Sequence, residues 1–85
     1  MSDAPSTSRL AGQLDYLFED RPELRTASVA TLAARLNHED RYARARARYP
    51  LETDVEVTAH IDEFPPRITE ADVSAALAHL RAGHS

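Results

Sequence analysis

The sequence predicts a mainly α-helical domain with a minor β component: about four short helices and one strand or short β-hairpin. Large apolar residues recur every three to four positions in four segments, which is the period of an amphipathic helix. One further segment, residues 54–61, alternates apolar and polar side chains as a half-buried strand does. The expected order, helix–helix–helix–strand or hairpin–helix, is that of a winged-helix fold.

The chain has 85 residues, which is enough for one small domain. Residues 8–83 are expected to form that domain, between a disordered N-terminal tail (1–7) and a C-terminal tail (84–85). Of 36 hydrophobic residues 15 are alanine, which leaves 21 large side chains, one of them the initiator methionine. So small a core is near the lower limit for a chain that folds alone, and this favours self-association.

The first helix is expected from Ser8, as its N-cap, to about Glu19. Its apolar face follows the i, i+4, i+7, i+8 spacing, and Pro22 marks the break after it. The residues of this face are Leu10, Leu14, Leu17 and Phe18.

The second helix is expected to begin at a cap formed by Thr26 or Ser28, or as early as Pro22, and to end near Asn37. A third helix then runs from about Asp40 to Tyr49, where the following proline stops it. On this third helix three arginines share one face, and the opposite face is expected to bury two tyrosine rings. The arginines are Arg41, Arg44 and Arg48, and the opposite face holds Tyr42, Ala45 and Tyr49.

The alternating segment places Val55, Val57, Ala59 and Ile61 on one face of the expected strand. A lone strand cannot satisfy its own backbone groups. Either residues 67–68 return as a short partner strand, or the strand pairs with another chain across a dimer. The last helix is expected to start at a capping box formed by Thr69 and Asp72 and to end at Gly83. Its apolar stripe is Val73, Ala76, Leu77 and Leu80.

The run from Ile68 to Leu77 resembles the loop and final helix of histone-fold proteins over about ten residues. A histone fold places one long uninterrupted helix just before that loop. In this chain Pro50, the predicted strand and Pro65-Pro66 stand at that place. No fold or function is therefore transferred from the resemblance.

The net charge of −4 is unevenly distributed along the chain. Residues 21–49 carry seven arginines against three acids, whereas residues 50–66 carry five acids and no base. Two explanations stay open. With a helix-turn-helix around Asn37-His38, the basic residues are candidate contacts for DNA phosphates or for an acidic partner: Arg35, Arg41, Arg44 and Arg48. Alternatively, the acidic residues form an interaction face complementary to the basic one in self-association or protein docking: Glu52, Asp54, Glu56, Asp62 and Glu63.

No catalytic, cofactor-binding or metal-ligating constellation is recognised. Cysteine is absent and the two glycines are isolated, so neither a thiolate site nor a glycine-rich phosphate loop is expected. Without a secretory signal or a membrane span, the chain is expected to be cytoplasmic. The sequence thus predicts a small non-enzymatic regulatory or interaction protein that acts through protein–protein contacts as a homodimer. The alternative is a winged-helix DNA-binding regulator.

Overall fold

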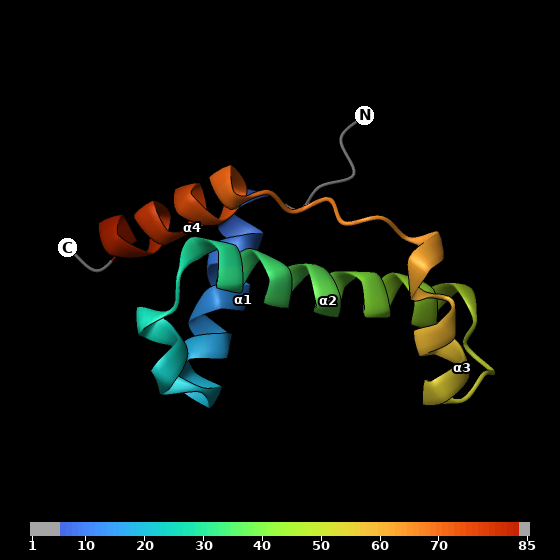
Figure 1. Ribbon diagram of the computed structural model, residues 1–85. Helices are drawn as coiled ribbons and strands as arrows, with labels where there is room; N and C mark the ends of the chain where they lie inside the picture. Colours follow the sequence, from blue (N-terminus) through green and yellow to red (C-terminus); the bar gives the residue numbers. More distant parts are fainter. Residues whose placement is uncertain (1–5, 84–85) are drawn as a thin grey trace.

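The computed structural model describes residues 6–83, and every regular element among them is helical. The long helix α2 (Val29–Arg48) forms the axis of the molecule (Figure 1). Its N-terminal half packs against α4 (Glu70–Gly83) and shares a core with α1 (Thr7–Asp20). Helix α1 in turn packs against α4 and the 3-10 helix η1 (Pro22–Thr26), and these elements form the main lobe. The C-terminal half of α2 carries α3 (Asp54–Ala59) and the 3-10 helix η2 (Ile61–Glu63). We call residues 49–64 the α3 lobe.

The main lobe holds the hydrophobic core. Leu14 is fully buried between the helices, and the predicted apolar face of α1 is confirmed in full. The helix begins two residues earlier than expected, because Ser6 and not Ser8 accepts a hydrogen bond from the Arg9 amide, at 3.2 Å. The core cluster is Leu10, Ala11, Leu14, Leu17, Phe18, Leu32, Ala33, Leu36, Ile68, Val73 and Ala76.

The C-terminal helix α4 also follows the prediction. Thr69 and Asp72 form a reciprocal capping box, in which each side chain accepts a hydrogen bond from the other residue's amide, at 3.1 and 2.9 Å. Val73 is completely buried, whereas Leu77 and Leu80 are half-buried at the edge of the core. The tail predictions for residues 1–5 and 84–85 lie outside the described residues.

The predicted break between a second and a third helix is wrong. α2 continues through Asn37 and His38 as one helix of 20 residues and ends at Arg48, one residue before the predicted Tyr49. Ser28 caps its start, accepting from the Thr31 amide at 3.1 Å. With no turn at 37–38, the expected helix-turn-helix is not formed.

The predicted strand is also wrong, because residues 54–59 form helix α3. Thr53 and Glu56 make a capping box: the Thr53 hydroxyl accepts from the Glu56 amide, and the Glu56 carboxylate accepts from the Thr53 amide. Of the four residues expected on the buried face, only Val57 is buried, and Val55 is 82% exposed. Residues 6–83 contain no strand, so neither the winged-helix order nor a strand-paired dimer applies to them.

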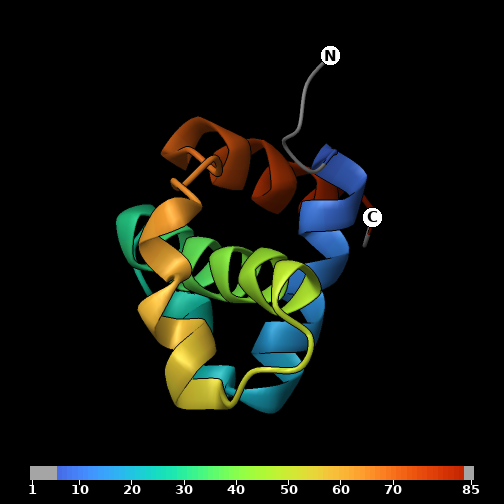
Figure 2. The same ribbon diagram turned by 90° about the vertical axis from the view of Figure 1, so that its right-hand side faces the viewer.

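The two lobes make the molecule elongated. Its radius of gyration is 13.8 Å, whereas a compact chain of this length is expected to have about 12 Å. In the described part of the α3 lobe and the α2 segment beneath it, the buried residues are Ala45 and Val57, and neither belongs to the core cluster. The end-on view shows α1 and α3 on different sides of α2, with α4 across it (Figure 2). The α3 lobe is therefore held to α2 mainly by polar contacts.

Candidate functional site

Two of the four arginines predicted to meet DNA hold the chain segment that links α3 to α4. Arg41 donates from Nε to the Phe64 carbonyl at 2.5 Å and from Nη2 to the Ile61 carbonyl at 3.2 Å. Arg44 donates from Nη2 to the Pro65 carbonyl at 2.7 Å, and its guanidinium lies 5.8 Å from the centre of the Phe64 ring. Both side chains are only about a quarter exposed. They are therefore structural, contrary to the prediction of a solvent-facing arginine surface.

Arg35 and Arg48 bind no backbone carbonyl of the α3–α4 link. Arg48 is exposed at the end of α2, whereas Arg35 is half-buried in the first half of the same helix and lines a groove. The structure thus divides the predicted basic set, and no single face presents all four guanidinium groups. The predicted tyrosines are only half-buried: Tyr42 donates to Asp54 at 2.6 Å and Tyr49 donates to Glu63 at 2.6 Å.

The predicted acidic interaction face consists of groups that make contacts within the chain. Asp54 pairs with Arg46 and accepts the Tyr42 hydroxyl. Asp62 pairs with Arg41 at 3.5 Å, although its side chain is 95% exposed. Glu56 belongs to the capping box of α3. The uneven distribution of charge along the sequence therefore largely reflects acidic side chains of the α3 lobe that pair with arginines of α2.

The remaining two acids, Glu52 and Glu63, enclose His60. The His60 ring places Nε2 2.9 Å from a Glu52 carboxylate oxygen and Nδ1 2.7 Å from a Glu63 carboxylate oxygen. The ring stacks on Tyr49, with centroids 3.9 Å apart and planes 17° from parallel. We call Tyr49, Glu52, His60 and Glu63 the His60 cluster.

The electrostatics of the α3 lobe follow from these contacts. Hydrogen bonding to Glu63 and the nearby Glu52 charge raise the pKa of His60 above its ordinary 6.5. The Tyr49 hydroxyl and then His60 lower the pKa of Glu63. The Tyr42 hydroxyl and the Arg46 charge lower the pKa of Asp54, and the Thr53 amide lowers that of Glu56.

Two residues of α2 that the sequence analysis did not single out fix the start of α4. The Asn37 side chain donates to the Ile68 carbonyl at 2.7 Å and accepts from the Ile68 and Arg67 amides at 2.9 and 3.2 Å. Asp40 binds the Arg67 guanidinium through two hydrogen bonds of 2.9 Å and lies 3.0 Å from Arg44 Nε. Because both partners lie about thirty positions away, no local sequence pattern could have identified these contacts.

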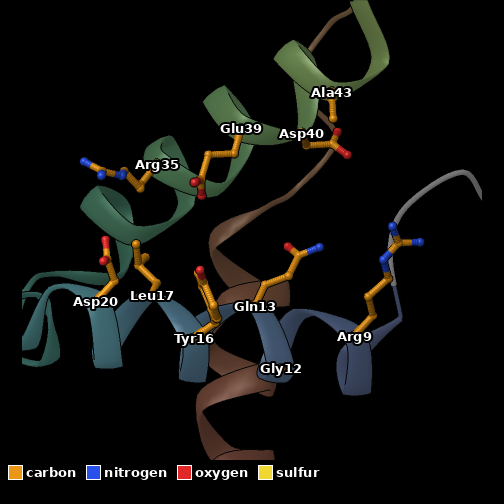
Figure 3. A pocket seen from close by; sticks show the side chains of 10 residues that line it. All are labelled: Arg9, Gly12, Gln13, Tyr16, Leu17, Asp20, Arg35, Glu39, Asp40 and Ala43. Carbon is orange, nitrogen blue, oxygen red and sulfur yellow. The ribbon is translucent and has the colours of Figure 1, made fainter. Parts of the chain in front are cut away.

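Residues 6–83 form at least two concave sites of similar volume, about 580 Å³ and about 560 Å³, which share Arg35 and Glu39; the first is the α1–α2 groove. It lies where α1 and α2 diverge beyond the main core (Figure 3). Tyr16 and Gln13 point from α1 toward α2, and Glu39 points back from α2 (Figure 3). The Tyr16 side chain is 75% exposed. The lining residues are Arg9, Gly12, Gln13, Tyr16, Leu17, Asp20, Arg35, Glu39, Asp40 and Ala43.

The groove carries charges of both signs in an ordered way. Asp20 and Glu39 point into the space between the two helices, whereas Arg35 lies at its rim and points away (Figure 3). Among residues 6–83 neither Arg35 nor Glu39 forms an ion pair, unlike the charged groups of the α3 lobe. These charges are thus available to a molecule that enters the groove.

Two further searches of the described chain gave no site. Among residues 6–83, no group of three or more His, Cys, Asp or Glu side chains is arranged so that it could hold a metal ion. None of the helices in this range combines the length and the apolar character that crossing a membrane requires. Comparison of the chain with protein-family models, with curated proteins and with solved structures found no match.

Proposed function

We propose that this chain is a small non-enzymatic regulatory or interaction protein that acts through protein–protein contacts, and that its α1–α2 groove binds a second copy. The observation that carries the proposal is the exposed Tyr16 ring in a groove where Arg35 and Glu39 form no ion pair with another group of residues 6–83. Aromatic side chains with mixed charge around them are typical of protein interfaces.

The arrangement of charge favours a second copy over an unrelated partner. In a two-fold symmetric dimer each contact occurs twice, so a surface must be complementary to itself. The groove meets this condition, because Arg35 at its rim can enter the groove of the other copy beside that copy's Glu39. A thin core, with 13 buried hydrophobic residues in the described chain, gives the molecule a further reason to bury surface between copies.

The winged-helix alternative has lost its structural basis. The described chain has no strand for a wing and no turn at residues 37–38, and Arg41 and Arg44 bind backbone carbonyls. We therefore propose no DNA-binding function.

A charge-reversal experiment tests the proposed dimer. Arg35→Glu and Glu39→Arg should each raise the dimer dissociation constant by about tenfold, because each places like charges in contact across the interface. The double variant should recover most of the lost affinity. Sedimentation equilibrium across a range of concentrations measures the constant for each variant.

Arg81→Glu is the matched control, since Arg81 is an exposed arginine on α4 outside the groove. It should leave the dissociation constant unchanged. A wild-type chain that stays monomeric at every concentration would refute the proposal, and so would a double variant that is weaker than both single variants.

A further inference from the structure

The α3 lobe depends on a small number of polar contacts. Its helix has six residues and its 3-10 helix three, and both pack against α2 and against each other. Val57 is its fully buried large side chain among the described residues. An element with so little buried apolar surface opens at lower free energy than the rest of a protein. The polar contacts therefore decide how often the lobe opens.

The His60 cluster joins three parts of this lobe. Glu52 belongs to the segment between α2 and α3, His60 ends α3, and Glu63 lies in η2. Tyr49, at the end of α2, stacks on the imidazole and donates its hydroxyl to Glu63. The imidazole thus links both ends of the lobe to the helix beneath it.

The positions of the two carboxylates around the His60 ring suit a protonated, positively charged imidazole. Both ring nitrogens lie within 2.9 Å of carboxylate oxygens, and a carboxylate accepts hydrogen bonds but cannot donate them. A neutral imidazole has one N–H and can donate to only one of the two acids, so its other nitrogen would face the second acid's lone pairs. The imidazolium donates from Nδ1 to Glu63 and places its positive charge, at Nε2, 2.9 Å from the Glu52 carboxylate.

The charges around the ring also favour the imidazolium. On α3 the Glu56 carboxylate interacts with the ring charge, and Glu52 and Glu63 contact it directly. The opposing cation on α2 is Arg48, whose charge acts on Glu63 and Tyr49. Asp62, next to Glu63 in η2, pairs with Arg41. Three carboxylates thus face the ring, and its side chain is 32% exposed, so it can exchange protons with water.

We propose that His60 is a pH-sensitive switch: its protonated ring holds the α3 lobe on α2, and loss of the proton loosens this lobe while the main lobe stays folded. The switch lies outside the α1–α2 groove and does not depend on the dimer. Loosening the lobe uncovers Val57 and the Ala45 face of α2.

The direction in which the stability of the α3 lobe changes with pH follows from the pKa shifts of His60 and Glu63. The pKa of His60 is raised in the folded lobe, so its stabilisation is complete below the ordinary value of 6.5 and is lost as the pH rises through the folded pKa. The pKa of Glu63 is lowered, so its stabilisation is present above the ordinary value of 4.5 and is lost as the pH falls. The α3 lobe is therefore most stable between pH 4.5 and pH 6.5, the ordinary pKa values of Glu63 and His60.

Amide hydrogen exchange followed by NMR tests the switch. After correction for the intrinsic pH dependence of exchange, amides of residues 57–64 should lose protection as the pH rises above 6.5. Amides of α1 and α4 should not change. His60→Gln should remove the pH dependence within the lobe, because the amide side chain has no charge in this range. His38→Gln, an exposed histidine on α2, should leave it intact.

Titration of the wild-type imidazoles gives a second, independent measurement. The His60 ring should titrate at a pH above the ordinary value of 6.5. A titration midpoint of the His60 ring at or below pH 6.5 would overturn the proposal, even if the α3 lobe of the His60→Gln variant fails to fold. Lobe protection that is independent of pH, or that falls equally in α1 and α4, would also overturn it.

Discussion

Leu14→Ala is expected to lower the free energy of unfolding by about 2–5 kcal/mol, the range for a large-to-small change at a fully buried site. Leu14 has no exposed surface and lies in the core shared by α1, α2 and α4. Because Leu14 lies in the core formed by α1, α2 and α4, the neighbouring side chains can fill only part of the cavity that the smaller alanine leaves. Chemical denaturation followed by circular dichroism measures the change.

The control for this variant is Leu51→Ala, which makes the same chemical change at a side chain that is 98% exposed. It should alter the free energy of unfolding by less than about 0.5 kcal/mol. Similar losses for the two variants would show that α1 does not pack as described. Because a domain of this size has about 5–10 kcal/mol of stability in total, the Leu14 variant should be close to unfolding at physiological temperature.

Asn37→Ala is expected to cost about 2 kcal/mol. The change leaves the Ile68 amide and carbonyl without partners beside the core, at about 1–3 kcal/mol for an unsatisfied buried group, while the higher helix propensity of alanine returns about half a kcal/mol. Ile68 is itself 4% exposed, so its backbone groups cannot easily turn to water. Thermal unfolding measures the loss.

His38→Ala is the matched control for the Asn37 variant, because the neighbouring residue lies exposed on the same helix turn. It should change stability by less than about 0.5 kcal/mol. An Asn37 variant as stable as this control would show that the link between α2 and the start of α4 contributes nothing. A loss seen only for Asn37 would explain why a residue of low helix propensity stands in the middle of a 20-residue helix.

Helices α1 and α4 could be predicted because their signals are local. The apolar spacing of α1 and the Thr69–Asp72 capping box each lie within one or two helical turns. The same local reasoning could have identified α3, since Thr53 and Glu56 have the spacing of a capping box. The alternation of residues 54–61 predicted a strand instead, although a six-residue helix needs to bury only one side chain, Val57, against α2.

Local sequence patterns could not predict that α2 continues without a break, or that Arg41 and Arg44 bind backbone carbonyls. Asn37 is tolerated inside the helix because its side chain binds residues 67–68, and Arg41 and Arg44 are drawn from solvent by carbonyls of residues 61–65. These partners lie twenty or more positions away, so the helical wheel correctly placed the arginines on one face but could not show what covers it. The groove depends on the divergence of α1 from α2, which is likewise a tertiary property.

Concentration-dependent NMR spectra of ¹⁵N-labelled protein test self-association through the α1–α2 groove. Spectra recorded at a fixed pH from about 10 µM to about 1 mM cover the range of weak to moderate dissociation constants. We expect the amide signals of α1 and of residues 35–43 to shift with concentration, while those of the α3 lobe stay in place. Signals that do not move at any concentration, or that move in the α3 lobe and not in the groove, would contradict the claim.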